Sequence, residues 1–345
     1  MKPRDMVMSA VDHKTLPPII KTASPELEAE IRVRVRNLFG ARPLPFMRQL
    51  ISAWLVITIA ITLAIWLDNV WMSLIAIFLV ATRQNLLGLL VHEQVHRLGS
   101  RGPYGDLLTN LFAAYPLLVL TVEGYAQVHL AHHKYFYTGK DPDYARKSGP
   151  EWSIPMSRGQ FARLFLHDIL GLNILRLIRS KKPYTDGVRD EFRRRHPTPQ
   201  WVRPTYWIIV AGALTYSGGW AHFLLYWVLP LITVAQCLVR LGALSEHKYN
   251  VNSPELNDST HLIELSWWER LLLPNMNFTL HHYHHMYPGL SFATLPLVHQ
   301  MYKEADLVHQ ENILHGYGDF IRRRVLGEQH SPAAPANWPQ SAPPA

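Results

Sequence analysis

The apolar positions of this chain gather in long runs rather than in the short alternating patterns of a soluble domain. Leu50 to Leu67 holds 18 residues without a charge, and a helix of that length extends about 27 Å, close to the thickness of a bilayer's hydrocarbon core. Asp68 and Asn69 separate it from a second apolar run, Val70 to Val91. Its polar interruptions are Arg83, Gln84 and Asn85. A buried hairpin in a soluble protein is the alternative, but the two lengths together favour a transmembrane hairpin.

A second hairpin follows in residues 203–217 and 220–243, with its turn at Gly218 and Gly219. Between the hairpins, Leu107 to Val122 is apolar but short for a crossing, and Asn110 and Pro116 interrupt it. Such a segment is expected to enter the membrane and return on the same side. The pattern predicts an all-α integral membrane protein with about four transmembrane helices in two hairpins, a re-entrant or interfacial segment and a cytoplasmic helical cap.

The expected organisation has three parts. A cytoplasmic segment covers residues 1–45, and a membrane domain covers 46–325 with spans at about 50–67, 70–91, 203–217 and 220–243. The tail, 326–345, is rich in proline and alanine and is expected to be disordered.

Positive charge orients these spans, because lysine and arginine collect on the cytoplasmic side of short membrane segments. Arginines precede the first span and fill the segment between the hairpins, whereas the turns within the hairpins hold no lysine or arginine. Both termini and the middle segment are therefore predicted to be cytoplasmic. The net charge of +8 is explained by this topology and by anionic headgroups, and we expect no nucleic-acid partner.

The 19 histidines of the chain include three clusters, each beside an apolar segment. We call them the histidine boxes. The first is "HEQVH" (His92, Glu93, His96) and the second is "HLAHH" (His129, His132, His133). The third is "HHYHH" (His281, His284, His285), in which His282 lies off the helix face that the other three share. Residues three and four apart share one face of a helix, so the imidazoles of each box can point at one place.

The set of boxes implies more than one metal ion. A zinc protease would use the H-E-x-x-H helix, with Glu93 as general base, and one further ligand. That reading leaves two whole boxes unexplained, and eight or more imidazoles exceed what one tetrahedral zinc binds. Imidazole suits iron, copper and zinc alike, so the ligands alone do not name the metal.

The three boxes together resemble the membrane fatty acid desaturase superfamily, the integral-membrane non-haem di-iron enzymes, in a bacterial type. The resemblance extends to "HHKYFYTGKDPDY" after the second box, to "HHMYPGLSFATLPLVH" around the third, and to "RLGALSEHKY" before it. It covers about residues 46–302.

The resemblance implies two non-haem iron ions at the cytoplasmic membrane face. Their expected ligands are His92, His96, His129, His132, His133, His247, His281, His284 and His285. Four acidic residues adjacent to these expected ligands are expected to accept imidazole N–H groups and so orient the ligands. They are Glu93, Asp141, Asp143 and Glu246.

The implied function is that of an O2-dependent oxidoreductase that forms a C=C bond in the alkyl chain of an acyl lipid or acyl thioester. The alternatives within the same superfamily are a lipid or alkane hydroxylase and a carotenoid ketolase or hydroxylase. The zinc protease is a less favoured alternative. With a single cysteine, Cys237, the chain cannot hold an iron–sulfur cluster. A separate electron donor of ferredoxin, rubredoxin or cytochrome b5 type and its reductase are therefore expected, and the expected location is a bacterial inner membrane.

Overall fold

The computed structural model describes residues 17–102, 104–174, 188–251 and 253–328. The predicted C-terminal tail lies outside the described residues beyond 328, as do the first 16 residues and part of the basic segment between the hairpins. Within the described part the regular secondary structure is helical apart from two strands of three residues each. The all-α membrane fold predicted from the apolar runs is confirmed.

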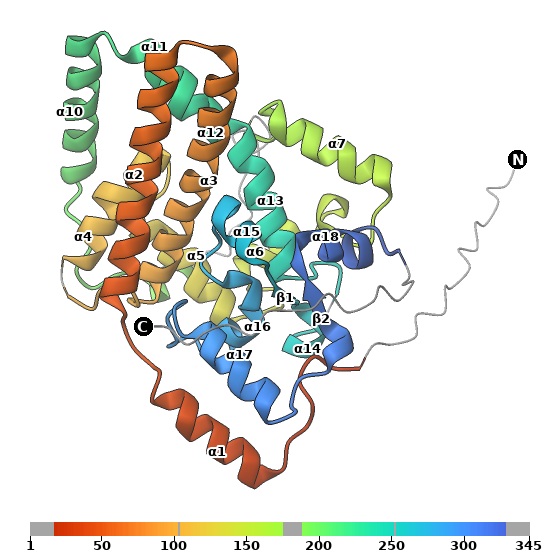
Figure 1. Ribbon diagram of the computed structural model, residues 1–345. Coiled ribbons are helices and arrows are strands. Elements are labelled where there is room, and N and C mark those ends of the chain that lie inside the picture. The colour runs from red at the N-terminus through yellow and green to blue at the C-terminus, as the bar shows by residue number, and fades with distance from the viewer. Residues whose placement is uncertain (1–16, 103, 175–187, 252, 329–345) are drawn as a thin grey trace, which may run out of the picture.

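The first hairpin joins α2 (Pro43–Leu67) and α3 (Val70–Val95), which pack side by side (Figure 1). Asp68 ends α2 in the left-handed conformation, with φ 45°. Asn69 then caps α3, because its side chain accepts a hydrogen bond from the N–H of Met72. The predicted two-residue turn is therefore built from a left-handed residue and a helix cap. A further helix, α1 (Pro25–Arg36), precedes the hairpin.

The second hairpin joins α10 (Val202–Ser217) to a longer, interrupted helix. Gly218, with φ 66°, ends α10. The interrupted helix consists of α11 (Trp220–Phe223), the π-helix η4 (Leu224–Val228), α12 (Leu229–Ile232) and α13 (Val234–Glu246). Among the described residues three helices, Pro43–Leu67, Val70–Val95 and Trp220–Glu246, have the length and hydropathy of a membrane span. α10, at 16 residues, is shorter.

The segment between the hairpins bends back on itself. α4 (Gly105–Thr109), η1 (Asn110–Ala114) and η2 (Tyr115–Leu117) meet α5 (Val122–Lys134) at 91°. A break leaves backbone carbonyls without helical partners, which is tolerated at membrane depth only where protein groups bind them. The indole of Trp54 donates to the carbonyl of Phe112 and that of Trp227 to the carbonyl of Pro116, each at 2.8 Å. The bend matches the geometry predicted for a re-entrant segment.

The remaining elements lie mostly at one end of the long helices, where α14, α16 and α17 are seen in Figure 1, and form a helical cap there, whereas α7 (Arg158–Ile169) lies beside α13. They are α6 (Pro142–Lys147), η3 (Pro150–Trp152), α7 (Arg158–Ile169), α9 (Val188–Glu191), α14 (Leu256–Ser259), β1 (Leu262–Glu264), α15 (Trp267–Leu272), η5 (Phe278–Leu280), α16 (His281–Met286), α17 (Leu295–Glu304), η6 (Gln310–Asn312), β2 (Ile313–His315), α18 (Gly316–Phe320) and η7 (Ile321–Val325). β1 and β2 pair in parallel, with Leu262 opposite Ile313. One large apolar core runs from α2 and α3 into α16 and α17, so the cap and the spans are packed together.

Candidate metal centre

Four segments bring the nine predicted histidine ligands to one place. The first box lies at the end of α3, the second on the last turns of α5 and the third on α16, and His247 is the residue that follows α13. The nitrogen atoms of these imidazoles point at one another in two neighbouring groups. The first group is His92, His96, His129, His133 and His284, and the second is His132, His247, His281 and His285.

The first group draws on all three boxes. The Nε2 atoms of His96 and His129 are 2.9 Å apart. The Nε2 of His133 lies 3.0 Å from that of His129 and 3.0 Å from that of His284. His92 completes the group, with its ring centre 4.1 Å from that of His129. Four of these imidazoles have ligand atoms within 4.8 Å of one another, and His133 lies beside two of them.

The second group contains the histidine outside the boxes. The Nε2 of His247 lies 3.2 Å from that of His132 and 3.1 Å from that of His281. His285 joins through its Nε2, 3.1 Å from that of His281. His247 is extended, with φ −136° and ψ 149°, and forms a backbone bridge to Thr260. The chain therefore leaves α13 in the direction that brings this imidazole to the others.

The spacing of these nitrogen atoms fits metal coordination. With a metal–imidazole bond of about 2.0–2.1 Å, two ligands of one ion are about 2.9 Å apart at a right angle and about 3.3 Å apart at the tetrahedral angle. The Nε2 pairs lie 2.9–3.2 Å apart. Two neighbouring groups of such nitrogens suit two ions rather than one.

Burial keeps the imidazoles of the third box neutral. Desolvation, and then the charge that neighbouring imidazoles would carry, hold the pKa of His281, His284 and His285 well below 6.5. The same causes lower the pKa of His247. A neutral imidazole has a free lone pair and is the form that binds a metal ion.

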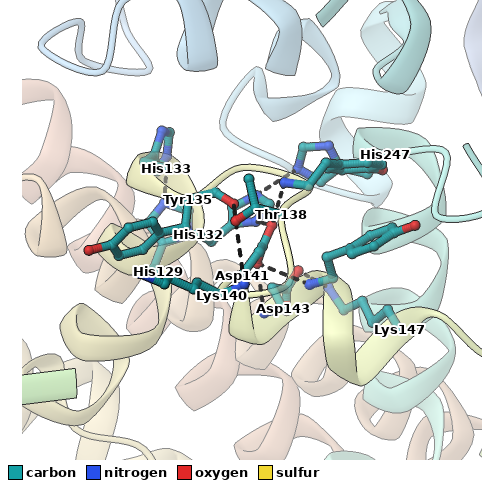
Figure 2. Close-up of polar contacts among 12 residues, drawn as sticks. His129, His132, His133, Tyr135, Thr138, Lys140, Asp141, Asp143, Lys147 and His247 are labelled. Carbon is teal, nitrogen blue, oxygen red and sulfur yellow. Dashed lines mark hydrogen bonds and ion pairs between the residues drawn. The ribbon is translucent and has the colours of Figure 1, made fainter. Parts of the chain in front are cut away.

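Asp141 is the acidic residue that contacts a box histidine as predicted (Figure 2). Its Oδ2 lies 2.9 Å from Nδ1 of His132 and accepts from the N–H of Tyr137. Its Oδ1 caps α6 by accepting from the N–H groups of Asp143 and Tyr144. One fully buried carboxylate thus caps a helix and aims Nε2 of His132 at the second group, as expected for a residue that orients a ligand.

Glu93 and Asp143 have contacts different from those predicted. The carboxylate of Glu93, fully buried, accepts from the N–H of Phe292, in the loop after the third box. Asp143 binds Arg146 and Lys147, each at 2.8 Å. Glu93 therefore joins the first box to the loop after the third, whereas the ion pairs of Asp143 lie within α6.

Glu246 lines the cavity described below. Among the described residues none of Glu93, Asp143 and Glu246 has a hydrogen bond to an imidazole. His282, predicted to lie off the stripe, instead meets the hydroxyl of Thr260 through its Nδ1 at 2.9 Å.

An apolar cavity of about 400 Å³ ends at the histidines, within the usual range of small-molecule sites. α3, α5, α12 and α13 contribute its walls, as do the segments around Leu117 and Phe278. His92, His129, His132, His247 and His281 line it, so both groups are reached from one space. Its polar lining includes Gln84 and Asn85. The sequence shows these as interruptions of the second apolar run, but their role was missed because periodicity does not tell a cavity wall from a lipid-facing or packed surface.

Two comparisons with known proteins agree with this geometry. The sequence model of the fatty acid desaturase family matches residues 69–316. The chain belongs to the fatty acid desaturase family. A dihydrorhizobitoxine desaturase from Bradyrhizobium elkanii is 28% identical over 252 residues, which cover 68% of this chain and 69% of that protein. Like this relative, the chain is a desaturase-type oxidoreductase, and the histidine boxes and the cavity lie within the matched region, apart from Tyr317 at the cavity wall.

Proposed function

We propose that this desaturase holds two iron ions on its nine histidines and uses O2 to remove two hydrogens from neighbouring carbons of an alkyl chain. The observation that carries the proposal is the pair of imidazole groups, with Nε2 atoms 2.9–3.2 Å apart, at the end of an apolar cavity. The overall reaction is R–CH2–CH2–R′ + O2 + 2 e⁻ + 2 H⁺ → R–CH=CH–R′ + 2 H2O. Bound iron would supply the reduction of O2 and the abstraction of hydrogen from an unactivated carbon.

The protein's own groups prepare the site for this chemistry. Buried, neutral imidazoles provide the lone pairs, and Asp141 fixes the ring of His132. Phe278 packs edge-on against His92, with ring centres 4.4 Å apart, and Tyr125 stacks on His129. These rings and the apolar cavity walls exclude water from the reacting carbons, which protects a strong oxidant from side reactions.

The electrons come from a separate ferredoxin, rubredoxin or cytochrome b5 type of protein and its reductase, and the alkyl chain comes from a membrane lipid or an acyl thioester. The metal centre, both termini and the basic segment between the hairpins lie on the cytoplasmic side of a bacterial inner membrane. The excess of arginine in that segment supports this orientation.

Metal analysis tests the proposal most directly. The protein purified in lipid nanodiscs should contain about two irons per chain, and His92→Ala, His132→Ala and His284→Ala should each lower that content and abolish turnover. His222→Ala, an exposed histidine in α11, is the matched control and should keep both.

Product analysis separates the related reactions. With a reduced donor and O2, an alkene should form, whereas an alcohol as the main product would assign the chain to the hydroxylases. One zinc per chain with peptide cleavage would overturn the proposal in favour of a protease.

A further inference from the structure

The face of α3 that leads to the histidines carries polar side chains inside an otherwise mainly apolar cavity. Asn85, Gly88 and His92 are spaced three and four residues apart, and all three line the cavity. They therefore form one stripe along the helix. Asn85 lies two turns, about 10 Å, from His92. Gln84 and Thr82 also line the cavity.

The amide groups of this stretch are incompletely used by the protein. Nε2 of Gln84, which is 1% exposed, donates to the carbonyl of Trp227 at 2.8 Å, and this fixes the orientation of the amide. Its Oε1 has no hydrogen-bond partner in the described part of the chain. Asn85 is half-buried, and no partner of its amide is found among the described residues. The hydrogen bond to Trp227 accounts for Nε2 of Gln84. It leaves Oε1 of Gln84 and the amide of Asn85 without a structural role.

Unpaired polar groups are unfavourable inside a membrane helix, and those that face a cavity rather than lipid mark the path of a ligand. The cavity wall near these groups also leaves space for a ligand. A Cβ added at Gly88 would meet nothing closer than a methyl of Leu117 at 3.9 Å, and one added at Gly242, on the facing α13, would meet nothing within 4 Å. Gly88 therefore leaves room between Asn85 and His92 on α3, and Gly242 leaves room elsewhere in the same cavity.

We propose that the substrate of this desaturase carries a neutral hydrogen-bonding group, a hydroxyl or an amide, about 10 Å from the carbons that react, and that Asn85 and Gln84 bind it. The inference rests on the proposed function, because His92 marks the position of the reacting carbons. A donor on the substrate would pair with Oε1 of Gln84, and the amide of Asn85 can both donate and accept. A chain that ends in a methyl group would leave these groups unpaired, which is the basis on which such sites reject an analogue lacking the polar group.

A matched pair of probes tests this inference. Dodecanoate and 12-hydroxydodecanoate differ only in the terminal hydroxyl, and their dissociation constants are measured by calorimetry on the iron-loaded full chain in nanodiscs. The wild type should bind the hydroxylated probe at least tenfold more tightly. Asn85→Leu should bring the ratio of the two constants to one or below, Asn85→Gln should keep most of the preference, and Gln300→Leu, an exposed amide on α17, should leave the ratio unchanged.

Equal binding of the two probes by the wild type, or a ratio that Asn85→Leu does not change, would overturn the inference. Iron content is measured on the same samples. A chain without iron would overturn the proposed function, whereas a di-iron protein with no preference for the hydroxylated probe would overturn only this inference.

Discussion

The Nε2 atoms of His132 and His247 lie 3.2 Å apart, although 115 positions separate the two residues in the chain. His132 comes from the helix that follows the re-entrant segment, and His247 from the end of the last long helix. The contact forms only if the re-entrant segment returns to the side on which the second hairpin ends. The path of the chain through the membrane therefore determines whether the metal centre can form.

His247→Ala should lose iron and activity as severely as the loss of a box histidine. His247 contacts both His132 and His281 through Nε2, so its removal opens the second group at its middle. Iron per chain and turnover are measured together. His282→Ala should retain most of both, because His282 meets Thr260 instead of the imidazole groups. Full metal content in His247→Ala would remove this residue from the site.

Asp141→Asn should weaken iron binding by about 10- to 100-fold, the usual effect of changing a group that orients a metal ligand. Asparagine is also a good helix cap, so α6 should persist in this variant. Asp141→Ala should in addition lower the free energy of unfolding by about 1 kcal/mol through the lost cap. Titration of the apoprotein with Fe²⁺, with thermal unfolding alongside, distinguishes the two effects. Unchanged iron affinity in Asp141→Asn would contradict the orienting role.

Much of this site follows from the sequence because it depends on local spacing. The second and third boxes are visible as i, i+3 and i+4 patterns, and the first as a pair of histidines four apart. The partner of Glu93, by contrast, is the N–H of Phe292, 199 positions away. Nothing local in the sequence indicates that pairing, since it depends on how the loop after the third box folds over α3. The sequence shows Asn85 as a polar residue in an apolar run, but only the structure shows that it lines the cavity.

Glu93→Gln should keep its iron and lose no more than several-fold in turnover. A glutamine oxygen can still accept the hydrogen bond from Phe292. Glu93→Leu should be more damaging, since it leaves that buried N–H unpaired at a penalty of about 1–3 kcal/mol. Comparing thermal stability and turnover of the two variants checks this. Complete inactivity of Glu93→Gln with full metal content would instead indicate a general base, as a zinc protease requires.

The ion pairs that His315, Lys303 and His299 form with Glu264 predict a dependence of stability on pH. Although burial opposes ionisation, hydrogen bonds from His299, His315 and Lys303 hold the pKa of Glu264 well below its usual value. The Glu264 carboxylate in turn raises the pKa of His315 above 6.5. The folded state therefore binds the His315 proton more tightly than the unfolded state. This contribution is complete below about pH 6.5 and disappears as the pH rises through the folded pKa.

His315→Gln should consequently lower the melting temperature at pH 5.5 and leave it unchanged at pH 9. The side chain of His315 is 61% exposed, so the loss should be at most about 1 kcal/mol. Repeating the measurement in a Glu264→Gln background gives a double-mutant cycle, in which the pH-dependent difference should vanish. A difference that grows toward pH 9 would have the wrong sign and would exclude this pairing.

Gly242→Leu should block turnover without harming the fold or the metal centre. Gly242 lines the cavity from α13, and a Cβ there would meet nothing within 4 Å, so the new side chain would occupy substrate space rather than packed protein. Glycine is less favourable than alanine in a helix by roughly 0.8–1 kcal/mol, and leucine ranks close to alanine, so α13 should not be weakened. Gly212→Leu is the matched control, because Gly212 is an exposed position of α10 with equally open surroundings. Both variants should bind about two irons and melt at or above the wild-type temperature, but only Gly242→Leu should raise KM or abolish product formation. Wild-type kinetics in Gly242→Leu would show that the substrate reaches the histidines by a path other than this cavity.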